Sequence, residues 1–159
     1  MIDPIEFRRV MGHFATGVTV VTTRRPDGEP CGLTASAVSS VSVNPTLVLV
    51  CVERSADSHD CIRSTGAFAV NILQEEGGES LARRFATWEV KDKFRGVAYR
   101  EEQSGAPVLA DALAWLDCRV AEALPGGDHT IFLGEVLAAD ARVGTPLLYY
   151  RGGYGRFVP

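Results

Sequence analysis

The chain has 159 residues, 46% of them hydrophobic and 23% charged, which is typical of one soluble globular domain over residues 1–159. A formal net charge of −4 argues against a nucleic-acid partner, and no apolar run is long enough to span a membrane. Because the amino terminus also lacks a targeting pattern, we expect a cytoplasmic protein.

The first predicted element is a helix. Asp3 can cap it and Pro4 suits its first turn. Gly17 is predicted to end this element. Apolar residues at spacings of three and four mark one face of the helix, namely Phe7, Val10, Met11 and Phe14.

Strands dominate the rest of the chain. Apolar or β-branched runs predict strands over residues 18–23, 31–38, 46–52, 68–73, 113–124 and 129–139. Short helices are predicted over residues 57–65 and 79–86, and residues 91–103 are expected to be partly loop. Because strands and long helices do not alternate, we expect a mainly β fold, a closed antiparallel barrel with a few short helices, and not a doubly wound nucleotide fold.

The motifs of several common enzyme classes are absent. The sequence contains no His-Glu-x-x-His, no phosphate-binding P-loop, no Rossmann glycine pattern and no Gly-x-Ser-x-Gly elbow. We expect no metal site. The cysteines form no Cys-x-x-Cys pair and are expected to be small buried thiols: Cys31, Cys51, Cys61 and Cys118. If the protein is an enzyme, its difficult chemistry therefore belongs to a bound cofactor.

One segment is unusually rich in small hydroxyl residues. Seven of the nine residues in "TASAVSSVS", from Thr34 to Ser42, are Thr, Ser or Ala. Small residues let main-chain amides approach a flat or charged ligand, and hydroxyls can donate to phosphate or ribityl oxygens. The alternative is a strand whose Ser and Thr side chains simply face solvent.

Eight segments in the same order carry a resemblance to a known family: "FATGVTVVTT", "GLTASAVSSVSVNPTLVLVCV", "GAFAVNIL", "LARRFA", "KF", "GAPVLADALAWLDCRV", "GDHTIFLGEV" and "PLLYYRGGYG". Over nearly its whole length the chain resembles the flavin reductase-like family, the short NAD(P)H:flavin oxidoreductases that serve two-component monooxygenases. The chain has Ser36-Ala37 where many relatives carry Asn or a similar polar residue.

The resemblance implies a flavin-binding split β-barrel, antiparallel with Greek-key connections, that forms a homodimer. It implies FAD or FMN at the subunit interface, direct hydride transfer from NADH or NADPH, and delivery of reduced flavin to a partner monooxygenase. FAD and NADH are the favoured choices, the latter because an acidic chain with two lysines offers little grip on a 2′-phosphate.

The resemblance also implies site residues. Those expected along the ribityl chain and phosphate are Thr34, Ala35, Ser36, Ala37, Ser39 and Ser40. Those expected along the isoalloxazine edge are Cys51, Val52 and Glu53, with the hydroxyls of Ser55 and Ser58 on the phosphate side. A loop at the phosphate or adenine end comprises Arg84, Phe85 and Ala86, although Arg83 is an alternative to Arg84. His129 is expected to position the nicotinamide, and Tyr154 to lie beside it.

Two other functions remain open from the sequence. A flavin-binding electron carrier on the same barrel would need no nicotinamide pocket, and a heme or pyridoxal-phosphate protein could use a related barrel. We expect Trp88 and Trp115 to lie in the core or in dimer contacts and not to serve as flavin platforms.

Overall fold

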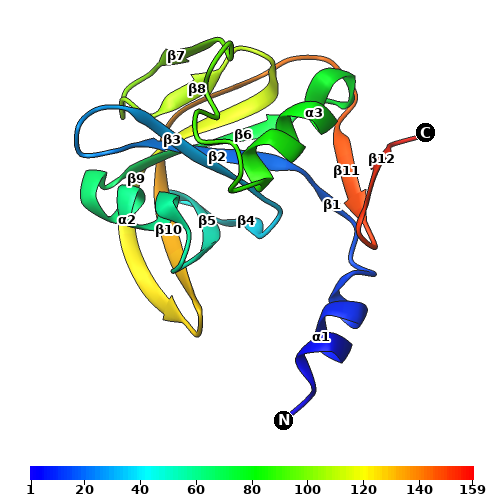
Figure 1. Cartoon of the computed structure of the whole chain (residues 1–159). Coiled ribbons are helices and arrows are strands. Elements are labelled where there is room, and N and C mark those ends of the chain that lie inside the picture. Colours follow the sequence, from blue (N-terminus) through cyan, green and yellow to red (C-terminus); the bar gives the residue numbers. More distant parts are fainter.

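A computed structural model describes residues 1–159 and has a mainly β fold with antiparallel pairing (Figure 1). The helices are α1 (Pro4–Met11), α2 (Asp57–Thr65) and α3 (Glu75–Ala86). The strands are β1 (Thr16–Gly17), β2 (Thr19–Arg24), β3 (Pro30–Ala35), β4 (Val38–Val43), β5 (Thr46–Glu53), β6 (Ala67–Leu73), β7 (Tyr99–Glu101), β8 (Pro107–Leu109), β9 (Ala112–Gly126), β10 (His129–Ala141), β11 (Leu147–Tyr150) and β12 (Gly153–Arg156).

Seven strands form the main sheet in the order β3-β2-β6-β9-β10-β5-β4. The strands β1, β11 and β12 form a second sheet, and β7 pairs with β8. The mainly β fold with few helices is therefore confirmed. No helix is both long and apolar enough to cross a membrane.

The core has two main parts. One lies under α2, where the fully buried Phe68 and Phe132 pack among valines of β2, β5 and β6. The other lies under α3, where Phe85 and Phe94 meet edge to face with their ring centroids 5.0 Å apart. Both helices therefore cover the sheet because each buries one apolar side against it.

The hydroxyl-rich segment runs along one edge of the main sheet. It leaves β3 at Ala35 and continues as β4, an edge strand that pairs only with β5. The connection is fastened to β5, since the Cys51 amide donates to the Ala37 carbonyl over 3.0 Å. The structure thus places the connection after β3 beside the second half of β5.

The first helix forms as predicted but ends earlier. The Asp3 carboxylate caps it, accepting from the amide of Ile5 at 2.7 Å. The expectation that the element extends to Gly17 was wrong, because α1 ends at Met11 and β1 begins at Thr16. No residue of α1 is buried, and the helix projects from the body of the molecule (Figure 1).

The two tryptophans have different surroundings in the single chain. Trp88 follows α3 and is 88% exposed, whereas Trp115 on β9 is half-buried. Of the two expected places, the core is therefore excluded for Trp88, and a dimer contact stays a prediction.

Candidate functional site

A cavity of about 200 Å³ opens between β3, the end of α3 and the sheet formed by β11 and β12. Four of the predicted site residues line it, and two further residues complete the wall. The lining is Val18, Thr34, Ser36, Ala86, Tyr149 and Tyr154. The fold thus brings together residues that are up to 136 positions apart in the sequence, from Val18 to Tyr154.

The hydroxyl groups of this wall have different tasks. The Thr34 hydroxyl donates to the Ala82 carbonyl of α3 over 2.6 Å and so fastens the sheet edge to the helix. Ser36 lies just beyond β3 and is exposed at the cavity. Thr34 therefore holds the shape of the wall, while Ser36 offers a hydroxyl to a ligand.

The opposite wall is aromatic. Tyr149 and Tyr154 face each other across the β11–β12 ladder, with ring centroids 5.3 Å apart. Burial raises the pKa of the Tyr154 phenol, so this side chain stays neutral at ordinary pH. A flat ligand would find an apolar face with a hydroxyl at its rim.

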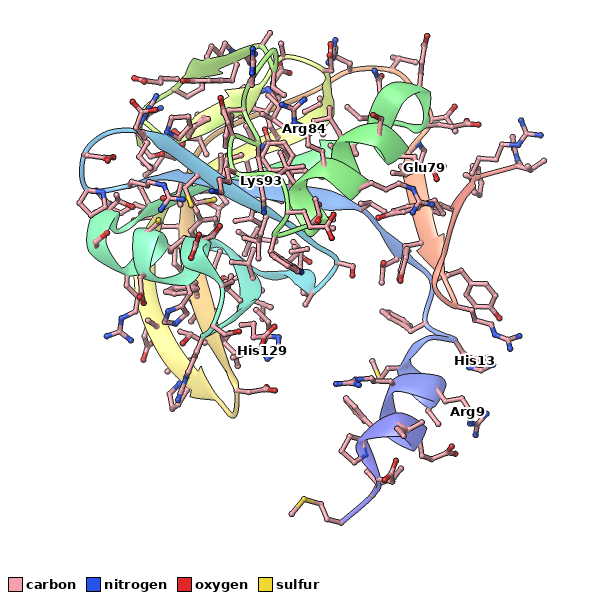
Figure 2. The ribbon with its side chains drawn as sticks, viewed as in Figure 1. Arg9, His13, Glu79, Arg84, Lys93 and His129 are labelled. Carbon is pink, nitrogen blue, oxygen red and sulfur yellow. The ribbon has the colours of Figure 1, made fainter.

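A second group of predicted residues lies where β5 ends and β10 begins. His129 pairs with Glu53 in the ladder, and its Nδ1 lies 2.7 Å from an oxygen of Asp128. The hydrogen bond from His129 lowers the pKa of Asp128. Ser55 donates to Glu53 over 2.7 Å, which gives this end of the sheet a polar cluster. Figure 2 labels His129 in this region.

Three predicted residues have side chains that face the core. Val52 and Phe85 are fully buried, and the hydroxyl of the buried Ser58 lies 3.4 Å from the sulfur of Cys31. Only the main chain of these residues could reach a ligand in this structure. Three others are more open, since Ala35 and Cys51 are half-buried and Ala37 is exposed. Ser39 and Ser40 are exposed on the edge strand β4.

The loop after α3 is held by two cations. Arg84 donates through Nη2 to the carbonyls of Asp92 at 3.2 Å and Arg95 at 2.6 Å. Lys93 donates to the Phe85 carbonyl over 3.1 Å, and burial lowers the pKa of its ammonium group. Figure 2 shows Arg84 and Lys93 at this end of α3.

His59 was not among the site residues expected from the sequence. This buried residue of α2 lies 2.8 Å through Nε2 from the Thr130 hydroxyl of β10, and its Nδ1 lies 2.9 Å from Asp60. The contact ties α2 to the strand that begins at His129. No motif surrounds His59, and only the packing of α2 against β10 reveals its role.

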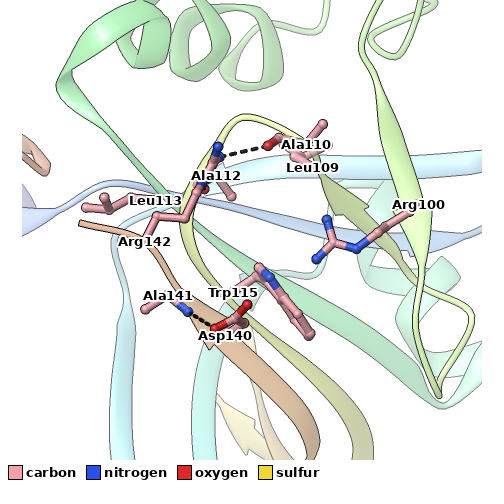
Figure 3. A pocket seen from close by; sticks show the side chains of 9 residues that line it. All are labelled: Arg100, Leu109, Ala110, Ala112, Leu113, Trp115, Asp140, Ala141 and Arg142. Carbon is pink, nitrogen blue, oxygen red and sulfur yellow. Dashed lines mark hydrogen bonds between the residues drawn. The ribbon is translucent and has the colours of Figure 1, made fainter. Parts of the chain in front are cut away.

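A second cavity, of about 150 Å³, lies where β7, β8 and β9 meet the end of β10 (Figure 3). Its charged groups are occupied within the chain. Arg142 donates to the carbonyls of Ala110 and Ala112, and Arg100 lies over the ring of Trp115. None of the predicted site residues lines it, so the first cavity is the candidate site.

The candidate site offers hydroxyls, main-chain groups and aromatic rings. No three His, Cys, Asp or Glu side chains come together in a way that could hold a metal ion. The arrangement suits binding and orienting a planar ligand with polar groups more than acid–base chemistry by the chain itself.

Comparison with known proteins matches residues 11–157 to the family described as the flavin reductase like domain. The chain belongs to this family. The resemblance seen in the sequence is thereby confirmed, since the match spans nearly the whole of this flavin reductase-like chain.

Relatives of this flavin reductase-like domain have related names. The reductase component of a Rhodococcus opacus 4-nitrophenol 4-monooxygenase/4-nitrocatechol 2-monooxygenase is 51% identical over 158 residues, which cover 99% of this chain and 83% of that protein. A flavin reductase (NADH) from Kitasatospora aureofaciens is 48% identical over 161 residues, covering 99% of this chain and 83% of that protein.

A solved structure gives the same fold. The NADH:FAD oxidoreductase of Streptomyces globisporus, in complex with NAD and FAD fragments, superposes with a TM-score of 0.91 at 43% identity. The match covers all of this chain and 97% of that one. The flavin reductase fold is therefore shared over the full length.

Proposed function

We propose that this protein is an NAD(P)H-dependent flavin reductase, an oxidoreductase of the EC 1.5.1 type. It reduces FAD, or FMN, by direct hydride transfer and supplies the reduced flavin to a partner monooxygenase. NADH is the preferred donor. The observation that carries the proposal is the cavity, because it is lined by four residues expected from the sequence to contact flavin or nicotinamide: Thr34, Ser36, Ala86 and Tyr154.

The residues present fit a flavin. The cavity joins an exposed hydroxyl of Ser36 to the aromatic wall of Tyr149 and Tyr154. Such a donor set matches the ribityl and phosphate oxygens of a flavin better than an apolar ligand.

A bound flavin supplies the redox chemistry, as acceptor of the hydride from a reduced nicotinamide. The chain's task is then to bind and orient, holding the reacting atoms about 3–3.5 Å apart. Ser36 and the main chain around Ala37 bind the polar part of the ligand, and Tyr154 limits the space beside the rings. His129 helps to position the nicotinamide. Because direct hydride transfer needs no acid, base or nucleophile from the chain, no catalytic triad is required.

We also propose that two chains form a homodimer of split β-barrels and that the partner completes the site. A cavity of about 200 Å³ is smaller than the roughly 300–1,000 Å³ of typical small-molecule sites. The amphipathic helix α1 further has no buried residue in the single chain, which leaves a surface suited to a second copy.

The experiment is steady-state oxidation of NADH and NADPH by the purified protein with added FAD or FMN. We expect a flavin-dependent rate that is faster with NADH. Flavin binding without any such rate would favour the electron carrier instead. A protein that binds no flavin, or that shows a Soret band, would contradict both readings.

The His129→Ala variant tests the nicotinamide assignment. We expect a higher KM for NADH or a lower kcat, with unchanged flavin affinity, because the side chain is placed at the donor and not at the flavin. The affinity is measured by fluorescence titration of FAD. An equal loss of flavin binding would show that His129 lies at the flavin end of the site.

A further inference from the structure

Two adjacent arginines on α3 have different surroundings. The half-buried Arg84 donates through Nη2 to two carbonyls of the following loop, and its Nε is buried without a partner. A phosphate in solvent cannot reach that nitrogen without displacing the loop. Arg84 therefore links α3 to the loop through hydrogen bonds.

Arg83 points elsewhere because successive residues of a helix are turned by about 100°. Its guanidinium carbon lies 5.0 Å from the centroid of the Tyr154 ring. Tyr154 in turn lines the candidate cavity together with Thr34 and Ser36. Arg83 thus brings a positive charge to the mouth of the site, and its side chain is 65% exposed there.

Two contacts hold this guanidinium in place. Its Nε and Nη2 both donate to one carboxylate oxygen of Glu79, one turn earlier on α3, over 2.9 and 2.7 Å. The Tyr154 ring supports its flat face. A guanidinium has five N–H donors, so three remain after these two bonds. Figure 2 shows Glu79 on the same helix.

We propose that Arg83 is the phosphate-recognising residue of this cavity, held over Tyr154 by Glu79 and presenting its remaining N–H groups to a nucleotide phosphate. The planar fork of arginine matches phosphate oxygens, and a partly fixed guanidinium loses less freedom on binding. The inference rests on the proposed function, because the phosphate is either that of the flavin, FAD or FMN, or that of the hydride donor, NADH or NADPH.

The test compares Arg83→Gln with Arg119→Gln. Arg119 is a matched control, since it is 64% exposed and pairs with Glu135 over 2.7 Å on the strands β9 and β10. Dissociation constants for riboflavin, FMN and FAD are measured by fluorescence titration. The KM values for NADH and NADPH are measured at saturating flavin.

We expect Arg83→Gln to weaken binding of phosphate-bearing ligands about tenfold, the usual size for one charge-assisted hydrogen bond, and to leave riboflavin unaffected. A loss for FMN and FAD would assign the phosphate to the flavin. A loss for NADH or NADPH alone would assign it to the nucleotide donor. Arg119→Gln should change none of these constants.

Two results would overturn the proposal. The first is that, in Arg83→Gln, the dissociation constants and KM values for all phosphate-bearing ligands stay within twofold of the wild-type values. The other is an equal loss for riboflavin, which would mean that Arg83 only packs on Tyr154. Failure of the function itself looks different, because the wild-type protein would then show no flavin-dependent oxidation of NADH.

Discussion

Cys118 illustrates how burial sets the chemistry of a single residue. It lies in the middle of β9, is fully buried and packs among the aromatic and aliphatic side chains under α2. Burial, with a smaller contribution from the neighbouring Asp117, raises the pKa of its thiol to about 12. The folded chain thus favours the neutral thiol, which makes Cys118 an inert residue of the core.

The raised pKa of Cys118 predicts a loss of stability at alkaline pH. Above about pH 9 the thiol of the unfolded chain ionises while the folded one does not, so the free energy of unfolding falls as pH rises toward 12. The free energy of unfolding of wild type should fall by up to about 1.4 kcal/mol per pH unit more than that of Cys118→Ala. Urea unfolding of both proteins at pH 8, 9 and 10 measures this difference. The same pH dependence of the free energy of unfolding in both proteins would contradict the prediction.

The candidate site could be located from the sequence only in part. Thr34, Ser36 and Tyr154, which the resemblance implied as ligand contacts, line one cavity, but the sequence could not show that the Thr34 hydroxyl bonds within the chain. It could not separate Arg83 from Arg84 either. Neighbours on a helix look alike in sequence, and the direction of each side chain depends on how the helix is turned against the sheet.

At the level of elements, Gly134 shows how closely β10 packs on the core. A Cβ atom added at this position would lie 2.4 Å from Cζ of Phe68 and 3.0 Å from Cβ of Cys118. The Phe68 ring is fully buried and has no free space to move into. Glycine is therefore required here by close approach between strand and core.

We predict that Gly134→Ala lowers the free energy of unfolding by about 1–3 kcal/mol, because the added methyl group overpacks the core. Urea unfolding monitored by circular dichroism measures it. Gly155→Ala on β12 is the control, since a Cβ there meets nothing within 4 Å. Equal stability of Gly134→Ala and wild type would mean that Phe68 has more room than its packing indicates.

The elements that the sequence revealed best are those with strong local signals. Gly66 stops α2 in the left-handed conformation, with φ at 66°, and the apolar run of β5 is a strand as predicted. The edge strand β4 was considered only as an alternative, a strand with Ser and Thr facing solvent, because its small polar residues lack the alternation of a half-buried strand. The short strands β7 and β8 were missed because their pairing joins residues with no shared pattern.

At the level of the whole molecule, the projecting helix α1 gives the dimer proposal a direct test. Its large apolar side chains are at least half exposed: Ile5, Phe7, Val10 and Met11, followed by Phe14. Such a helix gains little from the rest of its own chain. Its apolar side is expected to be covered by the second protomer.

We predict that wild type sediments as a dimer of the 17.1 kDa chain and that Phe7→Asp combined with Val10→Asp shifts it to monomer at micromolar concentration. Charged groups on the apolar side would have to be desolvated in the interface. Analytical ultracentrifugation measures the change. Arg9→Gln, which alters the polar side of α1, is the control, and a dimer that survives the double substitution would place the interface elsewhere.

The exposed indole of Trp88 gives the molecule its own optical reporter. The hydrogen bonds of Arg84 link the loop that follows this tryptophan to α3, the same helix that carries Arg83. Emission from an indole in water is red-shifted, so anything that covers the loop moves it toward the blue and shields it from quenchers. Any event that covers this loop can thus be followed by intrinsic fluorescence, without a label.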